Sequence, residues 1–436
     1  MASEKRSLSK RKNTWYPLDN AAKIYPPTAS DKRAHVFCFS AILTEEVDPY
    51  SLREAVVILL EKYPTFKTKL MRGKFWYYLE NNDLPFKVFK EDAYYLKSID
   101  HQQNNGYLFE VLYIRNKITV KFFHALTDGT GGFNFFKSLI LTYFSVIGKD
   151  VDAEGLLKPI DAPSTASEGE DSFLTYHNVT GDKTEKISKP YHIRAKPFDY
   201  DGCGMITAKV PISGVKELAN AANVTITAYL SALYSYCVYK AFLADRPEKN
   251  KLVTVLIPCN LRKKYGGETQ RNFTMFARFS HDYTVYDNTT VEQLAAECQN
   301  KMNDDLRVEK LDKIIDDNVK LERNFFIKIA PLILKDVIMR TAYAKVGEVL
   351  QTVNFSNLGL VKFPESVSPF VKEITFSITP TFSCNHQTGV IGYGDYLYVT
   401  FARGYVETEL EKTFIRFLTA KGLKIEVSSN FWESQP

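Results

Sequence analysis

The feature that most constrains this chain is the segment Phe122–Gly132, which reads FFHALTDGTGG. An apolar run ends at His124, Asp128 follows four residues later, and three of the four residues after Asp128 are glycines. The alternation before His124 predicts a strand, and the apolar periodicity from Gly132 to about Val146 predicts a helix. A strand, a tight turn and a helix must therefore follow one another, which is typical of a mixed α/β protein.

Two uses of this corner remain open from the motif alone. A neutral imidazole has an ordinary pKa near ~6.5, so His124 could take a proton from a hydroxyl group near neutral pH. Asp128 could face His124, or turn inward toward an arginine, because a buried carboxylate needs a partner. The glycines 129, 131 and 132 would let the backbone turn tightly. The competing interpretation is an ordinary corner in which Asp128 caps the helix.

A phosphate-binding loop does not fit this segment. Asn134 stands where the third glycine of GxGxxG is required, and no GK[ST] sequence follows. The choice is thus between catalysis and an ordinary corner.

A chain of 436 residues is too long for one hydrophobic core, so we expect two domains or a duplicated α/β unit. The composition changes over residues 152–190, where a stretch rich in Ser, Ala, Glu and Pro is followed by further polar residues, and this predicts a polar linker. The expected division is an N-terminal domain over 1–160, a linker over 161–190 and a C-terminal domain over 191–436.

The periodicity predicts the following elements. The expected strands are 34–43, a pair within 66–79, 107–114, 118–123, 205–210, 252–257, 272–281, 352–355, 374–379, a hairpin within 390–402, and 423–427. The expected helices are 48–63, 132–146, 212–222, 225–244, 291–312 and 408–421. Residues 1–32 are expected to be irregular, because Tyr25-Pro-Pro27 should prevent a helix.

Composition excludes several classes. The net charge of +5 is small, and the basic cluster Lys5–Lys12 has no second basic block beside it, so we expect no nucleic-acid partner. We expect neither a signal peptide nor a transmembrane segment, because no stretch reaches about 20 strongly apolar residues. The six cysteines form no CxxC pair and predict reduced thiols in the cytoplasm. The histidines form no HxxH pair, so no metal site is predicted.

The HxxxDG motif resembles the signature of the chloramphenicol acetyltransferase-like superfamily, which includes the BAHD acyltransferases, condensation domains and alcohol acetyltransferases. Phe123 stands where many members carry a further histidine. Other stretches resemble the alcohol acetyltransferase-like branch and follow its order along nearly the whole chain. They are WYPLDNAAKIYP at 15–26, YPTF at 63–66 with FWY at 75–77, IPCNLRK at 257–263 with RNF at 271–273, and VNFSNLG at 353–359.

The resemblance implies two α/β sandwich domains that form a pseudo-dimer with a tunnel between them. An acyl-CoA, in the first place acetyl-CoA, would enter one end as co-substrate, with no permanently bound cofactor. The acceptor alcohol would enter the other end, and the high content of Phe and Tyr suggests that it is small and apolar or aromatic. A monomer is expected, because one chain carrying two related domains builds the tunnel alone.

It also implies residue roles. His124 would be the general base, and Asp128 with Gly129 would hold the loop. Arg262 would be the buried partner of Asp128, unless it is a surface cation. Ser356 and Asn357 would donate hydrogen bonds to the oxyanion, unless Ser-Asn-Leu-Gly is only a turn. Asn272 would end a strand near the channel, where a capping role is favoured.

Two alternatives to an acyl-CoA-dependent alcohol O-acyltransferase stay open. The first is condensation-domain-like transfer from a carrier-protein thioester to an oxygen or nitrogen. The second is a non-catalytic relative that only binds.

Overall fold

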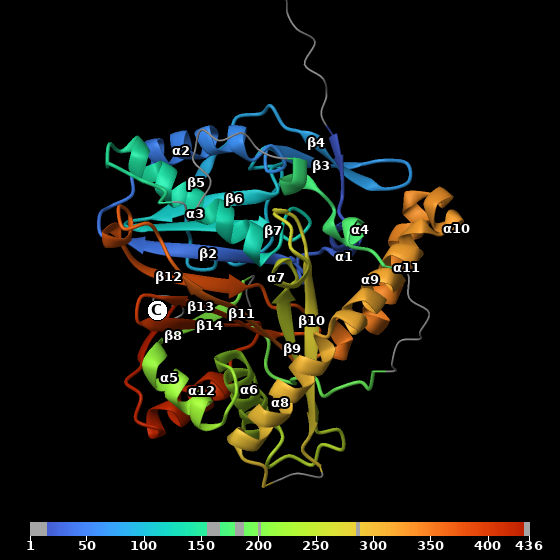
Figure 1. Cartoon of the computed structure of the whole chain (residues 1–436), viewed down its shortest axis with the longest axis vertical. Coiled ribbons are helices and arrows are strands. Elements are labelled where there is room, and N and C mark those ends of the chain that lie inside the picture. Colours follow the sequence, from blue (N-terminus) through green and yellow to red (C-terminus); the bar gives the residue numbers. More distant parts are fainter. Residues whose placement is uncertain (1–14, 155–165, 179–186, 199–201, 285–287, 431–436) are drawn as a thin grey trace, which may run out of the picture.

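A computed structural model describes residues 15–154, 166–178, 187–198, 202–284 and 288–430. The strands form three sheets (Figure 1): a seven-stranded sheet in the order β10-β9-β11-β13-β14-β8-β15, a five-stranded sheet in the order β12-β2-β7-β6-β5, and a three-stranded sheet in the order β1-β4-β3. Helices cover the outer faces of the two larger sheets.

The five-stranded sheet carries the corner that the sequence singled out. Its central strands are β2 (Val36–Leu43), β7 (Lys117–Phe123) and β6 (Phe109–Ile114), which pair antiparallel, while β5 (Val88–Lys90) pairs parallel with β6. Helices α2 (Pro49–Lys62) and α3 (Gly129–Val146) bury their apolar faces with it in one core rich in phenylalanine. The small sheet joins β1 (Trp15–Pro17), β4 (Tyr77–Asn81) and β3 (Thr68–Arg72).

The seven-stranded sheet forms the second core. Its strands are β8 (Gly204–Pro211), β9 (Leu252–Asn260), β10 (Thr274–Asp282), β11 (Val353–Val361), β13 (His386–Tyr393), β14 (Tyr396–Arg403) and β15 (Glu426–Ser429). It packs against α5 (Ile212–Ala221), α6 (Ile226–Phe242), α8 (Val291–Asp305) and α12 (Glu409–Ala420). Helix α6 is apolar around most of its circumference, because it is buried between the sheet and α8.

One strand crosses between the two halves of the sequence. Strand β12 (Val371–Ile378) follows β11 in the chain, yet it pairs antiparallel with β2, with Phe376 opposite Phe39. It also packs on β13, where a Cβ atom on Gly389 would lie 2.2 Å from the carbonyl oxygen of Phe376. The two sheets therefore contact each other where β12, the edge strand of the five-stranded sheet, packs closely on Gly389 of β13.

Two expectations about helices were wrong. Tyr25-Pro-Pro27 does not prevent a helix: α1 (Tyr25–Thr28) begins there with proline in its first turn, where the missing N–H has no intrahelical partner to lose. The single helix expected over 291–312 is broken into α8 and α9 (Val308–Arg323). Helices α10 (Phe325–Ile329) and α11 (Leu332–Val346) were not predicted at all.

Some expectations lie outside the described residues. The basic cluster Lys5–Lys12 lies outside them, as do residues 161–165 and 179–186 of the expected linker. The described part of the linker includes the short helix α4 (Ser172–Thr175). Among the described helices, none combines the length and the apolar character needed to traverse a bilayer.

Candidate active site

His124 comes directly after β7, where the five-stranded sheet ends. Its backbone N–H donates to the carbonyl oxygen of His35 at 2.9 Å, which extends the pairing of β7 with β2 by one residue. The side chain is half-buried. A rigid sheet therefore holds the imidazole at the point where the chain leaves it.

A single side chain fixes the tautomer of His124. The Oδ1 atom of Asn272 lies 3.0 Å from His124 Nδ1, and Asn272 Nδ2 donates to the backbone oxygen of His124 and to Asp19 Oδ2, both at 3.1 Å. Those two partners are acceptors only, so the amide nitrogen must face them and the amide oxygen must face the ring. His124 therefore carries its proton on Nδ1, and Nε2 keeps a lone pair.

Asn272 is itself held from behind. Asp19 is fully buried, and its Oδ2 lies 3.5 Å from Arg271 Nε. Arg271 Nη2 donates to the carbonyl oxygen of Pro17 at 2.7 Å, and Asp19 Oδ1 accepts from the N–H of Ala22 at 2.7 Å. The segment that follows β1 is thus tied to Arg271 and to the amide that orients His124.

Aromatic rings surround the imidazole. Tyr25 of α1 stacks on His124 with centroids 4.6 Å apart, and Phe37 meets it edge-on at 5.1 Å. Burial lowers the pKa of His124 below its ordinary value, although the negative charge of Asp128 and the hydrogen bond to Asn272 oppose this. The base is therefore neutral at pH 7.

His35 lies beside this ring cluster and has a left-handed φ of 49°. Burial is the main cause that lowers the pKa of His35 to about 3, and repulsion from Arg33, and from His124 once it is protonated, adds to it. Its Nε2 lies 2.9 Å from Thr28 Oγ1, and its ring meets Tyr25 edge-on. A strained, neutral histidine next to the candidate base indicates a functional constraint on this end of β2.

Asp128 is turned away from His124. Its Oδ1 caps α3 by accepting from the N–H groups of Thr130 (3.1 Å) and Gly131 (3.0 Å). Its Oδ2 accepts from the N–H of Phe273 (2.9 Å) and from Thr274 Oγ1 (2.8 Å). Both oxygens are thus occupied, and the residue joins α3 to the start of β10.

Arg262 pairs with Asp128 in a two-pronged arrangement. Its Nη1 lies 2.9 Å from Asp128 Oδ2 and its Nη2 lies 3.2 Å from Asp128 Oδ1, with the Arg262 side chain only 10% exposed. Burial alone would raise the pKa of Asp128, but the guanidinium and the N–H donors outweigh it and hold that pKa below its ordinary value. Arg262 also donates to the carbonyl oxygens of Thr269 and Arg271, so it fixes the segment that carries Asn272.

The glycines of the motif serve close approach rather than an unusual turn. Gly129, Gly131 and Gly132 all lack the left-handed φ that a tight glycine turn would require. A Cβ atom on Gly131 would lie 2.1 Å from the carbonyl oxygen of Gln270, and one on Gly129 would lie 3.2 Å from Leu358 Cδ2. The tight-turn explanation was therefore wrong.

Ser356 and Asn357 lie on β11, which shifts register against β13 between Asn357 and Leu360. Asn357 Nδ2 donates to Thr227 Oγ1 at 3.0 Å, and its Oδ1 accepts from the N–H of Gly359 at 2.8 Å. The intervening Leu358 reaches Gly129. Within the described residues the structure thus joins His124, Asp128, Arg262 and Asn272 in one network, and it places Ser356 and Asn357 on β11 without a direct hydrogen bond to that network.

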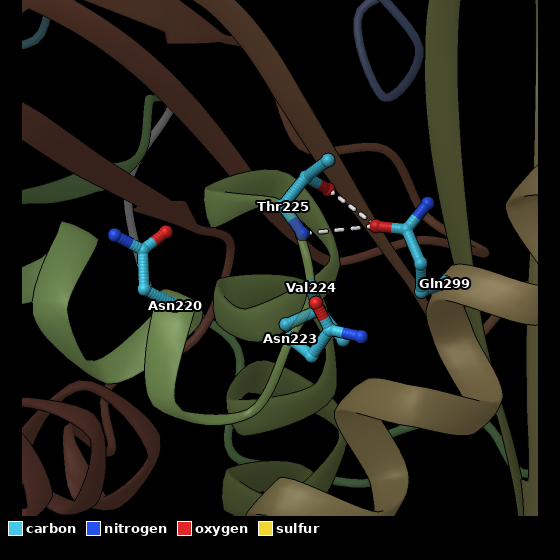
Figure 2. Close-up of a pocket in the computed structure, with 5 residues that line it drawn as sticks. All are labelled: Asn220, Asn223, Val224, Thr225 and Gln299. Carbon is cyan, nitrogen blue, oxygen red and sulfur yellow. Dashed lines mark hydrogen bonds between the residues drawn. The ribbon is translucent and has the colours of Figure 1, made fainter.

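Two hollows flank the start of α6. A groove of about 500 Å³ is lined by Thr227, Asn357, Gly359 and Lys216 among others. The adjoining pocket, of about 450 Å³, is lined by Asn220, Asn223, Val224, Thr225 and Gln299. Figure 2 shows the N–H and hydroxyl of Thr225 donating to Gln299 Oε1, at 2.9 and 2.8 Å. His124 lines neither hollow.

Sequence reasoning missed four residues of this network. Asp19 and Tyr25 lie inside the stretch 15–26 that carried the resemblance, but nothing there indicates a partner for either. Arg271 lies in the RNF stretch at 271–273 that also carried the resemblance, but no role was assigned to it, and His35 carries no signal, because a histidine before a strand is common. Among the described residues, no cluster of three or more His, Cys, Asp or Glu side chains could hold a metal ion.

Comparison with known proteins identifies the fold. No protein-family model matches the sequence, and no curated protein matches it. Among solved structures, TRI101 of F. sporotrichioides complexed with coenzyme A and T-2 superposes with a TM-score of 0.59 at 12% identity, over 94% of this chain and 99% of that chain. The trichothecene 15-O-acetyltransferase TRI3 of Fusarium sporotrichioides gives 0.59 at 10% identity, over 95% and 96%. The condensation domain of the Monacolin K polyketide synthase MokA gives 0.56 at 13% identity, over 94% and 96%.

These similarities extend over nearly the full length of each chain. The protein therefore has the mixed α/β fold of these acetyltransferases and of the condensation domain, which is the fold that the sequence resemblance predicted. At this level of identity the likeness concerns the fold.

Proposed function

We propose that this chain is an acyl-CoA-dependent O-acyltransferase, in the first place an acetyl-CoA:alcohol acetyltransferase, with His124 as its general base. One observation carries the proposal: Asn272 is fixed so that its oxygen faces Nδ1, which leaves the Nε2 lone pair of His124 available. The lowered pKa keeps that lone pair unprotonated at neutral pH.

The proposed step is direct transfer. Nε2 takes the proton of the acceptor hydroxyl while its oxygen attacks the thioester carbonyl. The tetrahedral intermediate then expels the thiolate of coenzyme A, which takes the proton back from Nε2. No covalent acyl-enzyme forms, and the six cysteines, all free thiols, are not used.

Ser356 is the first candidate for the oxyanion donor. Asn357 was proposed with it, but its amide is bound to Thr227 and Gly359 and would have to exchange a partner. Loss of one such donor typically costs about 10²–10³ in kcat. Asp128, Gly129 and Arg262 would act by holding the corner, and Asn272 by holding the base.

The comparisons support the donor and the acceptor class only by analogy. Two similar structures are acetyltransferases or carry coenzyme A, so we propose an acyl-CoA donor, and the aromatic content of 14% favours a small apolar or aromatic alcohol. We also propose a cytoplasmic monomer with an N-terminal domain at 1–160, a linker at 161–190 and a C-terminal domain at 191–436. Because a condensation domain is also among the similar structures, transfer from a carrier-protein thioester is the second candidate function.

The test is thiol release from acetyl-CoA in the presence of a panel of alcohols. His124→Ala should lower kcat by about 10²–10⁴, while the control His192→Ala, at a half-buried histidine that contacts the carbonyl of Ser383, should change it little. Activity that survives His124→Ala would refute the base assignment. Turnover only with a carrier-protein thioester would favour the condensation reaction, and neither turnover nor coenzyme A binding would favour a binding relative.

A further inference from the structure

Helices α10 and α11 carry the largest group of exposed apolar side chains in the described part of the chain. Figure 1 shows both helices at the edge of the molecule, beside the end of α9. The exposed members are Phe325, Phe326 and Ile329 of α10 and Ile333, Leu334, Val337 and Ile338 of α11, which we call the α10–α11 face. Phe326 and Ile333 are 76% and 70% exposed. A contiguous apolar group of this size on a protein surface marks an interaction site.

The α10–α11 face is not a core face left open by poor packing. On α11, positions 333, 334, 337 and 338 recur at helical spacing and share one side. The other side is bound to the protein: the N–H of Leu332 donates to the carbonyl oxygen of Lys74, and Lys335 Nζ donates to the carbonyl of Phe75 and lies 3.8 Å from the ring centroid of Trp76. Asp336 accepts from Tyr77 and Arg72. The helix is therefore anchored by its polar residues and presents its apolar ones outward.

The charges along this face are mainly positive. Residues 323–346 contain five cations and a single acid, Asp336, which is buried and already paired. The exposed cations are Arg323, Lys328, Arg340 and Lys345. A second copy of the chain would bring like charges together, whereas an anionic lipid surface would complement them.

We propose that the α10–α11 face docks on the anionic surface of a lipid bilayer, with its Phe, Ile, Leu and Val side chains in the headgroup–acyl boundary and its lysines and arginines against lipid phosphates. Mixed aromatic and aliphatic side chains with flanking Lys and Arg are the composition of helices that lie in a membrane interface. The inference concerns binding and does not depend on the acyltransferase proposal.

The docking surface is physically connected to the candidate site. Arg340 Nε donates to the carbonyl oxygen of Pro27 at 2.6 Å, and the Tyr343 ring meets His35 edge-on at 5.8 Å. Helix α1, which contributes Tyr25 to the His124 ring cluster, therefore lies directly against α11. A bilayer held at this face would lie on the side of the molecule where α1 meets α11.

The experiment is co-sedimentation of the full chain with vesicles of phosphatidylcholine alone and of phosphatidylcholine with about one-third phosphatidylserine. We expect binding to the mixed vesicles that weakens with added salt, and at least about tenfold weaker binding to phosphatidylcholine alone. Phe326→Ser with Ile333→Ser should weaken binding by about tenfold or more. Lys328→Glu with Lys345→Glu should remove the dependence on phosphatidylserine.

Matched controls separate the surface from general hydrophobicity and charge. Tyr50→Ser with Val57→Ser removes exposed apolar side chains from α2, where Tyr50 is 83% exposed, and should leave binding unchanged. Lys90→Glu with Lys424→Glu reverses two exposed charges elsewhere. Equal binding to both vesicle types would overturn the anionic requirement. Absence of binding to either vesicle type would overturn the proposal. If the chain were then found to be a dimer that Phe326→Ser with Ile333→Ser dissociates, the α10–α11 face would instead be the interface with a second copy.

Discussion

At the scale of single residues, the orientation of one amide decides the chemistry available to His124. Asn272 presents its oxygen to the imidazole because Asp19 and a backbone carbonyl occupy its nitrogen. In hydrolases that use a Ser-His-Asp triad, a carboxylate holds the histidine in its working tautomer. Here a neutral amide does so, and Asp128, the carboxylate of the motif, supports the loop instead.

Replacing Asn272 with Ala should lower kcat by about 10²-fold or more, because the Nδ1–H loses its acceptor and the ring is free to adopt the other tautomer. The KM for acetyl-CoA should change little. The hydrogen bond to the amide oxygen raises the pKa of His124, so its loss should lower that pKa and move the acid limb of the pH–rate profile to lower pH. Steady-state kinetics with Asn354→Ala as the control would measure this, and an unchanged kcat would contradict a positioning role.

The pH dependence of kcat/KM should report His124. The base works in its neutral form, so activity is lost as pH falls through its pKa. Because burial places that pKa below the ordinary value of 6.5, activity should persist below pH 6.5 and decline only at lower pH. A profile measured from pH 4 to 8 would test this, and a midpoint above 6.5 would contradict the burial argument.

The sequence predicted part of this network. The HxxxDG spacing and the Leu-Arg segment pointed to His124, Asp128 and Arg262, because each lies in a recognisable local pattern. Asn272 was named only as a strand end. Its contact with Asp19 joins residues 253 positions apart, and no local pattern reports such a pairing.

At the scale of elements, the corner joins three segments: α3, the short helix α7 (Arg262–Tyr265) and the start of β10. Asp128 and Arg262 hold them together through a nearly buried pair. The carboxylate pKa lies below its ordinary value, so the stability that the pair contributes is present at neutral pH and is lost as pH falls through the folded-state pKa.

Arg262→Ala should destabilise the protein by about 3–5 kcal/mol, because Asp128 would remain buried without a counter-charge. Lys263→Ala, at the exposed neighbouring cation, is the matched control and should change stability by less than about 0.5 kcal/mol. Urea unfolding followed by circular dichroism would measure both. Equal stabilities would mean that Arg262 does not hold the corner.

The glycines give a second element-scale prediction. Gly131→Ala places a methyl group 2.1 Å from a backbone oxygen, so α3 and the segment at Gln270 would have to separate. Gly129→Ala meets only the end of the Leu358 side chain, at 3.2 Å. We therefore expect a large loss of melting temperature for Gly131→Ala and a small one for Gly129→Ala, measured by differential scanning fluorimetry. Similar losses would contradict the close-approach explanation.

The sequence predicted helices and strands correctly where burial of one face imposes a regular spacing of apolar residues. The hairpin of β6 and β7, helix α2 and helix α6 all occur where apolar spacing placed them. Helices α10 and α11 were not predicted because most of their apolar residues are exposed, while the buried side of α11 includes Lys335 and Asp336. The usual spacing of buried apolar residues is therefore absent. The Pro-Pro segment was misjudged because proline was weighed as a helix breaker without regard to its place in the first turn.

At the scale of the whole molecule, β12 makes the five-stranded sheet dependent on the second half of the chain. Ile374 and Phe376 belong to the core that also contains α2 and α3, although they lie more than 200 residues further along the sequence. The edge of β2 is covered by β12 alone.

A fragment of residues 15–154 should therefore aggregate when produced alone, because the backbone groups of β2 would be exposed at a sheet edge. Co-production with residues 187–430 should restore a soluble complex. Size-exclusion chromatography would distinguish the two cases. A soluble, folded monomer of 15–154 would show that β12 is dispensable.

Strand β12 also sets an order of events during synthesis. A ribosome releases β2 and β7 long before it reaches residue 371, so the first sheet stays one strand short while most of the second is being made. Non-local pairing of this kind slows folding, because the intervening chain must be ordered first. The nascent protein therefore carries an open sheet edge for most of its translation, which makes β2 the place where a chaperone would be needed.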